Sequence, residues 1–311
     1  MKGLSGFKGV LFAIISSGTF GLIPLFTIPL VKEQNMNEGN ILFYRFGMSA
    51  VMMLLICLAK KSNLRIRLKD IAPIFALGLL YALTALFLVY AYNYIPSGIA
   101  TTIHFLYPIC VSFMMVMFFK EQKSKALIFA ALLSLIGVGL MCWTGSGSVS
   151  MIGVILSALT IITYGVYIVG LNQMNVGKLP ADVLTFYVIL AGAIIFLIYA
   201  YVDHDGVAAI PSVTAGVNLI ALAFLATVVS DFALILAVKY AGSTVTAILG
   251  SMEPLVAVCV GVLVFSDYFS LQLAVGLALI LSSVVLVVVA DHRKQKMQRT
   301  QKVYVEESTD K

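Results

Sequence analysis

The chain has 311 residues, of which 61% are hydrophobic and 11% are charged, with a net charge of +6. A soluble domain carries roughly 25% charged residues, so this chain cannot cover a water-facing surface with polar groups. Its apolar runs are about 18–23 residues long and lack period-2 alternation, which predicts membrane-spanning helices rather than a barrel. The basic residues lie in short segments between these runs, which argues against a nucleic-acid partner.

Ten helical spans are expected, joined by short connections. They lie near residues 9–30, 40–59, 71–93, 97–119, 126–143, 151–171, 183–202, 217–238, 243–265 and 270–290. No cleavage site of small residues follows the first span, so it is expected to be a retained helix rather than a signal peptide. The polar tail, residues 291–311, is expected to be cytoplasmic, as a mobile segment or a surface helix.

The distribution of Lys and Arg predicts the orientation. With the N-terminus in the cytoplasm and alternating spans, only Lys32 lies outside and only Arg45 lies within a span, out of 20 basic residues. This bias follows the positive-inside rule and predicts an even number of spans with both termini in the cytoplasm.

Two five-span units repeat within the chain. Shifted by 146 positions, the stretch from Leu88 matches a later stretch without a gap for about fifty residues. Matched pairs include Tyr94 with Tyr240, Ser97 with Ser243, Pro108 with Pro254, and Phe119 with Phe265. An odd number of spans per unit inverts the second copy in the membrane, as in secondary transporters. The expected units are residues 9–143 and 151–290.

The whole pattern resembles a known family. Ten spans in two units, the Phe43-Tyr44-Arg45-Phe46 stretch and the Glu253-Pro254 pair are similar to the drug/metabolite transporter superfamily, closest to the EamA-type carriers of bacterial inner membranes. The resemblance covers residues 9–290. It implies export of amino acids, metabolites or toxic compounds without ATP hydrolysis. The sequence agrees, because it contains no Gly-rich phosphate-binding loop ending in Lys-Ser or Lys-Thr.

The expected function is therefore secondary active transport, in the export direction, of small metabolites such as amino acids or amphipathic compounds. A small-molecule substrate, the lipid bilayer and a proton are the expected partners, with no cofactor and no metal. A non-transporting membrane partner or sensor is the alternative. The sequence contains no HExxH motif, no intramembrane acid pair and no Ser-His set, so it gives no indication of an enzyme. Small residues in spans 5 and 10 suit either packing within the chain or a homodimer contact: Gly137, Gly139, Ser282 and Ser283.

Ionisable residues within spans are the candidate functional sites, because a charge at a helix centre in lipid costs roughly 2.5–3.5 kcal/mol. They are Arg45, His104, Asp231 and Glu253. Glu253 lies about ten residues into span 9, about 15 Å deep by helix rise. Pro254 follows it and predicts a kink that frees backbone carbonyl groups. Such an acid suits a proton, a cation or a substrate amine, whereas a protonated Glu bonding two helices is the structural alternative.

The repeat places Tyr107 and Pro108 opposite Glu253 and Pro254, so the kinked spans 4 and 9 are expected to face each other. Tyr107 offers a hydroxyl or a stacking face to a cavity, or else packs between helices. Asp231 lies about 12 Å from the cytoplasmic end of span 8, at a depth close to that of Glu253. The two acids either share one proton or make separate helix–helix hydrogen bonds.

Arg45 and His104 lie nearer the outer surface. Arg45 is expected to snorkel or to pair with a backbone carbonyl at an outer gate, or else to bind an anionic substrate group. His104 is either a neutral buried histidine bonded to a neighbour or part of a proton relay. Aromatic residues of spans 3, 4 and 6 are further cavity candidates: Tyr81, Tyr90, Tyr92, Phe105, Tyr164 and Tyr167.

Overall fold

The computed structural model describes residues 2–95, 100, 103–120, 125–142, 150–203, 206–250, 252–264, 271–272, 274–283, 285–286 and 289. Within these ranges the chain is helical and contains no strand. The tail 291–311 and parts of the expected spans 4, 5, 9 and 10 lie outside the described residues.

The helices of the first half are α1 (Lys2–Phe20), α2 (Ile23–Lys32), α3 (Glu38–Ala59), α4 (Leu68–Tyr94), α6 (Tyr107–Phe119) and α7 (Lys125–Cys142). Those of the second half are α8 (Met151–Gln173), α9 (Ala181–Asp203), α10 (Val213–Ala223), α11 (Ser230–Ala241), α12 (Ser243–Leu249) and α13 (Met252–Val264). A 3₁₀ turn, Asn175–Lys178, precedes α9, and a π-helical segment, Phe224–Val229, joins α10 to α11.

Local sequence explains several helix ends. The Asn37 side chain accepts a hydrogen bond from the Asn40 amide at 2.7 Å and caps α3. At the other end of α3, Lys61 adopts a left-handed φ of 53°. The Ser62 amide then donates to the Cys57 carbonyl at 2.9 Å, which closes the helix by the usual six-to-one bond.

Six helices of the described part are long and apolar enough to cross a membrane: Gly6–Lys32, Glu38–Ala59, Leu68–Tyr94, Met151–Gln173, Ala181–Val202 and Val213–Ala241. They coincide with the expected spans 1, 2, 3, 6, 7 and 8. Shorter apolar helices, Tyr107–Phe119, Ile128–Gly137 and Ala274–Ser283, lie within the expected spans 4, 5 and 10. The count of ten spans stays a prediction.

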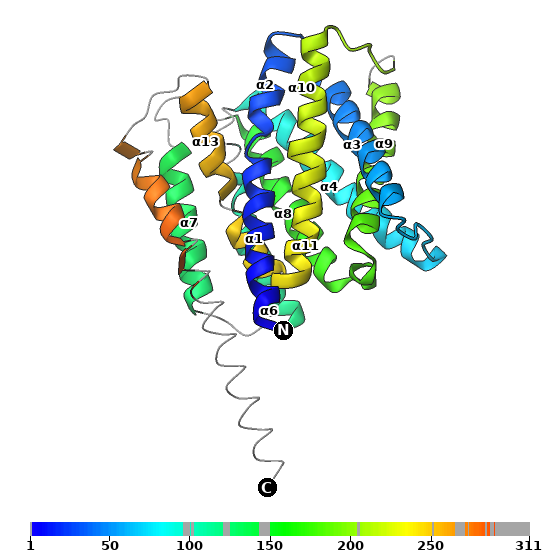
Figure 1. Ribbon diagram of the computed structural model, residues 1–311. Helices are drawn as coiled ribbons and strands as arrows, with labels where there is room; N and C mark the ends of the chain where they lie inside the picture. The colour runs from blue at the N-terminus through cyan, green and yellow to red at the C-terminus, as the bar shows by residue number, and fades with distance from the viewer. Residues whose placement is uncertain are drawn as a thin grey trace.

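Helix pairing reflects the two-repeat architecture. Extensive contacts join α1 to α11, which are the expected spans 1 and 8, and α4 to α8, which are the expected spans 3 and 6. Exchanging the two halves turns one of these pairs into the other. The pairs α3 with α9 and α6 with α12, spans 2 with 7 and 4 with 9, map onto themselves under the same exchange. In Figure 1, α1 rises from the end marked N while α10 and α11 descend toward it.

Small residues bring spans 5 and 10 together within the chain. A side chain at Gly137 would lie 2.7 Å from the Gly276 carbonyl oxygen and 2.9 Å from Ile280. Gly137 therefore serves packing inside the molecule, which is one of the two roles expected for it. A side chain at Gly139, by contrast, would have no neighbouring atom within 4 Å of its Cβ.

Candidate functional site

Arg45, the basic residue within span 2, is buried at 5% exposure and does not snorkel to the surface. Its Nε donates to the Thr227 hydroxyl at 2.8 Å. One terminal nitrogen donates to the Ala226 carbonyl at 3.3 Å and to the Tyr81 hydroxyl at 3.4 Å. The backbone-carbonyl pairing that was one of the sequence-based alternatives is therefore present, but inside the bundle.

The π-helical segment Phe224–Val229 explains why Arg45 finds a carbonyl there. A π turn breaks the regular ladder of a helix and leaves carbonyl groups without their usual amide partners, and such turns recur at functional sites. Arg45 binds the Ala226 carbonyl, and the Ser49 hydroxyl shares its proton between the Arg45 carbonyl of its own helix at 2.6 Å and the Ala223 carbonyl at 2.9 Å. Thus α3 of the first half is hydrogen-bonded to the π segment of the second half.

Asp231 lies in the first turn of α11, two residues beyond the π segment, and is 1% exposed. Neither of its carboxyl oxygens has a hydrogen-bond partner among the residues that the structure describes. Arg45 lies close enough to interact with it electrostatically, and the Tyr81 hydroxyl lies beside it as a hydrogen-bond donor that falls outside ideal geometry. A buried polar group without a partner is costly, so Asp231 is expected to have a ligand, a proton or water to bind during its working cycle.

An aromatic cluster surrounds these polar groups. Tyr81 and Tyr167 stack with ring centroids 5.3 Å apart, and Tyr164 lies 5.9 Å from Tyr167. The Tyr167 hydroxyl is also buried without a partner. Tyr107 continues the cluster, edge-on to Tyr164 at 4.8 Å. Rings with unpaired polar atoms suit an amphipathic ligand, because they offer stacking faces together with hydrogen bonds.

His104 is buried and makes a hydrogen bond to a neighbouring helix. The Thr160 hydroxyl donates its single proton to the Ser157 carbonyl at 2.5 Å. It must then accept from the Nδ1 of His104, 2.9 Å away. This assignment places a proton on Nδ1. His104 is thus buried and bonded to a neighbour, and its part in a proton relay stays a prediction.

Glu253 and Tyr107 lie at corresponding breaks in spans 4 and 9. Span 4 turns tightly at Leu106 before α6, and span 9 turns at Gly250 before α13. The expected prolines occupy the first turns that follow, where a missing amide proton costs no helical bond. The interruption therefore precedes each proline instead of forming a kink at it.

The two breaks also touch. A side chain at Gly250 would lie 1.7 Å from the Tyr107 hydroxyl, so the tyrosine fills the space that glycine leaves. Glu253, in the first turn of α13, is partly exposed, unlike Asp231. Glu253 interacts electrostatically with Arg45 and with Tyr107. The structure thus gathers Arg45, Asp231, Glu253 and Tyr107 around one centre.

Thr227 and Ser49 belong to this centre, although the sequence did not single them out. Hydroxyl residues are frequent in apolar helices, and no local pattern marks the π segment that contains Thr227. His104 lies at the edge of the centre, with its ring 5.2 Å from that of Tyr107. Tyr90, another expected cavity residue, is bonded elsewhere, to the Tyr199 hydroxyl between α4 and α9.

The fold and the site together define a polytopic helical membrane protein with a polar centre at the contact between two repeated halves, the arrangement of membrane transporters. The EamA-like transporter family matches residues 7–143 and 151–289, and the chain belongs to that family. One solved structure, described only as "Crystal structure of protein", has a TM-score of 0.79 at 16% identity, covering 91% of this chain and 98% of that chain. That likeness concerns the fold alone. No curated protein matches the chain.

Proposed function

We propose that the chain is a secondary active transporter, working as an exporter, that moves small metabolites such as amino acids or amphipathic compounds across a bacterial inner membrane by alternating access. The observation that carries this proposal is Asp231, whose buried carboxyl lacks a hydrogen-bond partner among the described residues. It lies beside Arg45 and the stacked rings of Tyr81 and Tyr167. A ligand with an ammonium group and an apolar body would satisfy both features.

In this mechanism Arg45 interacts with an anionic group of the ligand while it keeps α3 bonded to the π segment. Its Nε and one terminal nitrogen have partners, and the other terminal nitrogen has none among the described residues. That nitrogen is the group we assign to a carboxylate. A bound ligand would thus bridge Arg45 and Asp231, which come from opposite halves.

Glu253 is the proposed proton carrier. It is partly exposed, whereas Asp231 is 1% exposed, so Glu253 is the less enclosed of the two acids. Its place in the first turn of α13, after the break at Gly250, lets the residue move with a half-helix instead of a whole span. We further propose two working halves, residues 9–143 and 151–290, ten spans, and a cytoplasmic tail 291–311.

Flux into liposomes tests the proposed function. Purified protein is reconstituted and supplied with a panel of labelled amino acids and amphipathic compounds, with and without a pH gradient. We expect saturable uptake of one class of compound, accelerated by the gradient. Absence of flux for the whole panel, with folded protein in the vesicles, would favour a non-transporting partner or sensor.

A further inference from the structure

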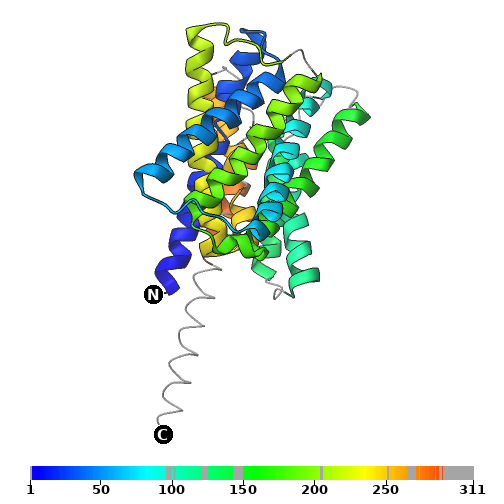
Figure 2. The ribbon, with the colours of Figure 1, turned by 90° about the vertical axis from the view of Figure 1, so that its right-hand side faces the viewer.

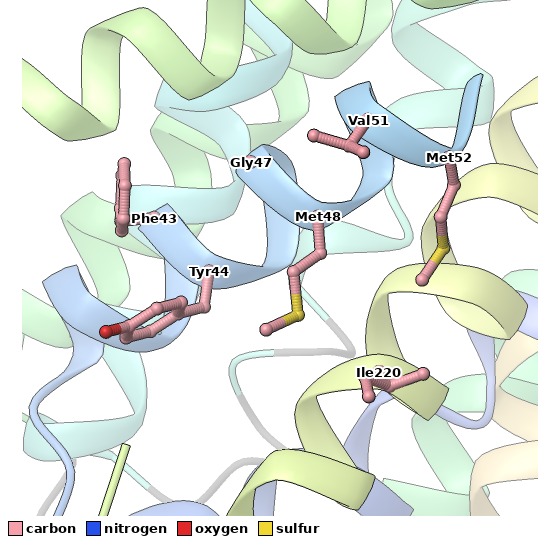
Figure 3. Close-up of a pocket in the computed structure, with 7 residues that line it drawn as sticks. All are labelled: Phe43, Tyr44, Gly47, Met48, Val51, Met52 and Ile220. Atoms are coloured by element: carbon pink, nitrogen blue, oxygen red, sulfur yellow. The ribbon is translucent and has the colours of Figure 1, made fainter. Parts of the chain in front are cut away.

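An apolar groove runs along the seam between α3 and α10, on the side of α3 away from the polar centre. Figure 3 shows Tyr44, Met48 and Met52 of α3 on the side that faces Ile220 of α10. The groove has a volume of about 420 Å³ and continues into a second of about 540 Å³ that shares Met52 and Ile220 with it. Its floor is open at Gly47, where a side chain would meet nothing within 4 Å.

This groove lies on a surface of the protein that faces lipid. Its rim is exposed and apolar, with Val51 at 59% and Ile220 at 51% exposure. It belongs to α3 and to Val213–Ala241, two of the helices long enough to cross a membrane. An acyl chain matches such a lining, because a polar ligand would leave its own groups without hydrogen-bond partners there.

Two lysines lie next to this seam, at the C-terminal end of α3. Lys60, the residue that ends α3, places its ammonium group 5.1 Å from the centre of the Phe232 ring of α11. Lys61 is exposed beside it. Asp182, the carboxylate that interacts with Lys60, is buried and accepts a hydrogen bond from Ser62, so it does not occupy the surface around the lysines.

The spacing fits a phospholipid. Gly47 and Lys60 are thirteen residues apart on one helix, about 20 Å at the usual rise. The hydrocarbon layer of one leaflet is about 15 Å thick. A phospholipid whose acyl chain reaches Gly47 therefore has its phosphate near the level of Lys60. Figure 2 shows that α3 is tilted, which brings these two levels still closer to the leaflet dimensions.

We propose that the seam between α3 and α10–α11 binds one anionic phospholipid, with an acyl chain in the groove at Gly47 and the phosphate on Lys60 and Lys61. This site is separate from the proposed substrate centre, but α3 forms a wall of both. Lipid bound here would therefore support the Arg45 contact with the π segment from its outer side.

Native mass spectrometry and thermal unfolding of the purified full chain test the proposal, with phosphatidylglycerol and phosphatidylcholine of identical acyl chains as probes. We expect phosphatidylglycerol to bind more tightly and to raise the unfolding midpoint more. Replacing Lys60 and Lys61 by Gln should weaken that preference by about fivefold for each lysine. Gly47→Trp should lower the binding of both lipids, because the indole fills the groove.

Gly139→Trp is the matched control, since Gly139 also faces open space but lies on α7. It should bind both lipids as the unaltered chain does. If Gly47→Trp does not fold, Val51→Trp at the exposed rim replaces it. Unchanged phosphatidylglycerol binding in the groove variant, or an unchanged preference in the lysine variant, would overturn the proposal.

Discussion

Asp231 is the residue at which we expect stability to be lowered for the sake of the proposed transport activity. Its two oxygens lack partners among the described residues, at 1% exposure of the side chain. Leaving a buried polar group unsatisfied costs about 1–3 kcal/mol. Functional sites commonly retain such unfavourable groups because the reaction or the ligand uses them.

Asp231→Leu keeps the branched shape and removes both unpartnered oxygens. We expect the free energy of unfolding to rise by about 1–3 kcal/mol, while flux of the substrate is lost. Thermal unfolding in detergent and liposome flux measure the two effects. A loss of stability without a loss of flux would show that the carboxyl is a structural group.

Glu253 tests the coupling of transport to protons. Glu253→Gln keeps the shape and the hydrogen-bonding capacity but cannot titrate. We expect normal insertion, exchange of substrate down its own gradient, and no accumulation against one. Counterflow and pH-driven uptake, measured on the same vesicles, separate these steps. Full pH-driven accumulation by the variant would remove Glu253 from the coupling role and leave Asp231 as the next candidate.

At the scale of elements, hydrogen bonds between side chains of α3 and the π segment join the two halves. The bond from Arg45 to Thr227 involves a charged donor at 2.8 Å in a buried place. Bonds to charged groups are worth about 1.5–3 kcal/mol, more than neutral ones. The bond from Ser49 to the Ala223 carbonyl is of the neutral kind.

Thr227→Val removes the acceptor of the Arg45 Nε without changing the size of the side chain. We expect it to lower the free energy of unfolding by about 1.5–3 kcal/mol. Ser49→Ala, the matched neutral case, should cost about 1 kcal/mol. Unfolding midpoints measured side by side decide the order. An equal or larger loss for Ser49→Ala would mean that Arg45 finds another acceptor.

The contact between the broken spans gives a second test at this scale. Gly250→Ala would place a methyl group only 1.7 Å from the Tyr107 hydroxyl oxygen, well inside van der Waals contact. We expect low yield or loss of flux, since overpacking typically costs 1–3 kcal/mol and here the overlap is severe. Tyr107→Phe in the same chain should restore the yield in part. No rescue by the double variant would indicate that another neighbour of Gly250 is the obstacle.

The whole molecule combines two repeats, and exchanging the repeats turns one helix pair into another. α1 with α11 and α4 with α8 form the exchanging pairs, so each half contributes the same kind of surface to the interface. Substrate sites of inverted-repeat transporters lie where the halves meet. The polar centre lies there, since Arg45 comes from the first half and Asp231 from the second.

Topology supplies the prediction at this scale. A reporter fused after Lys311 should signal from the cytoplasm, because the Lys and Arg distribution requires an even number of spans. A fusion in the 206–212 segment, between α9 and α10, should signal from the opposite side. A periplasmic signal after Lys311 would contradict both the even count and the proposed placement of the tail.

Much of this protein is determined by its sequence alone. Hydropathy is a local property, so the long spans are found at the expected positions, and α3 and α8 begin within two residues of them. The repeat is also legible, because paired residues such as Pro108 and Pro254 keep a constant shift along the chain. Ionisable residues within the expected spans can also be read from the sequence. Of these, Arg45, His104 and Asp231 are buried in the structure, whereas Glu253 is partly exposed.

Only the tertiary structure decided which of these groups meet. Apolar helices give no periodic signal for the face that they bury, so the inward direction of Arg45 and its bond to Thr227 were not predictable. The π segment arises where the packing of α3 against α10–α11 supplies donors for carbonyls that lack their usual helical partners, as Arg45 does for Ala226. The breaks lie at Leu106, two residues before Pro108, and at Gly250, four residues before Pro254, where Tyr107 and Gly250 meet across the two halves.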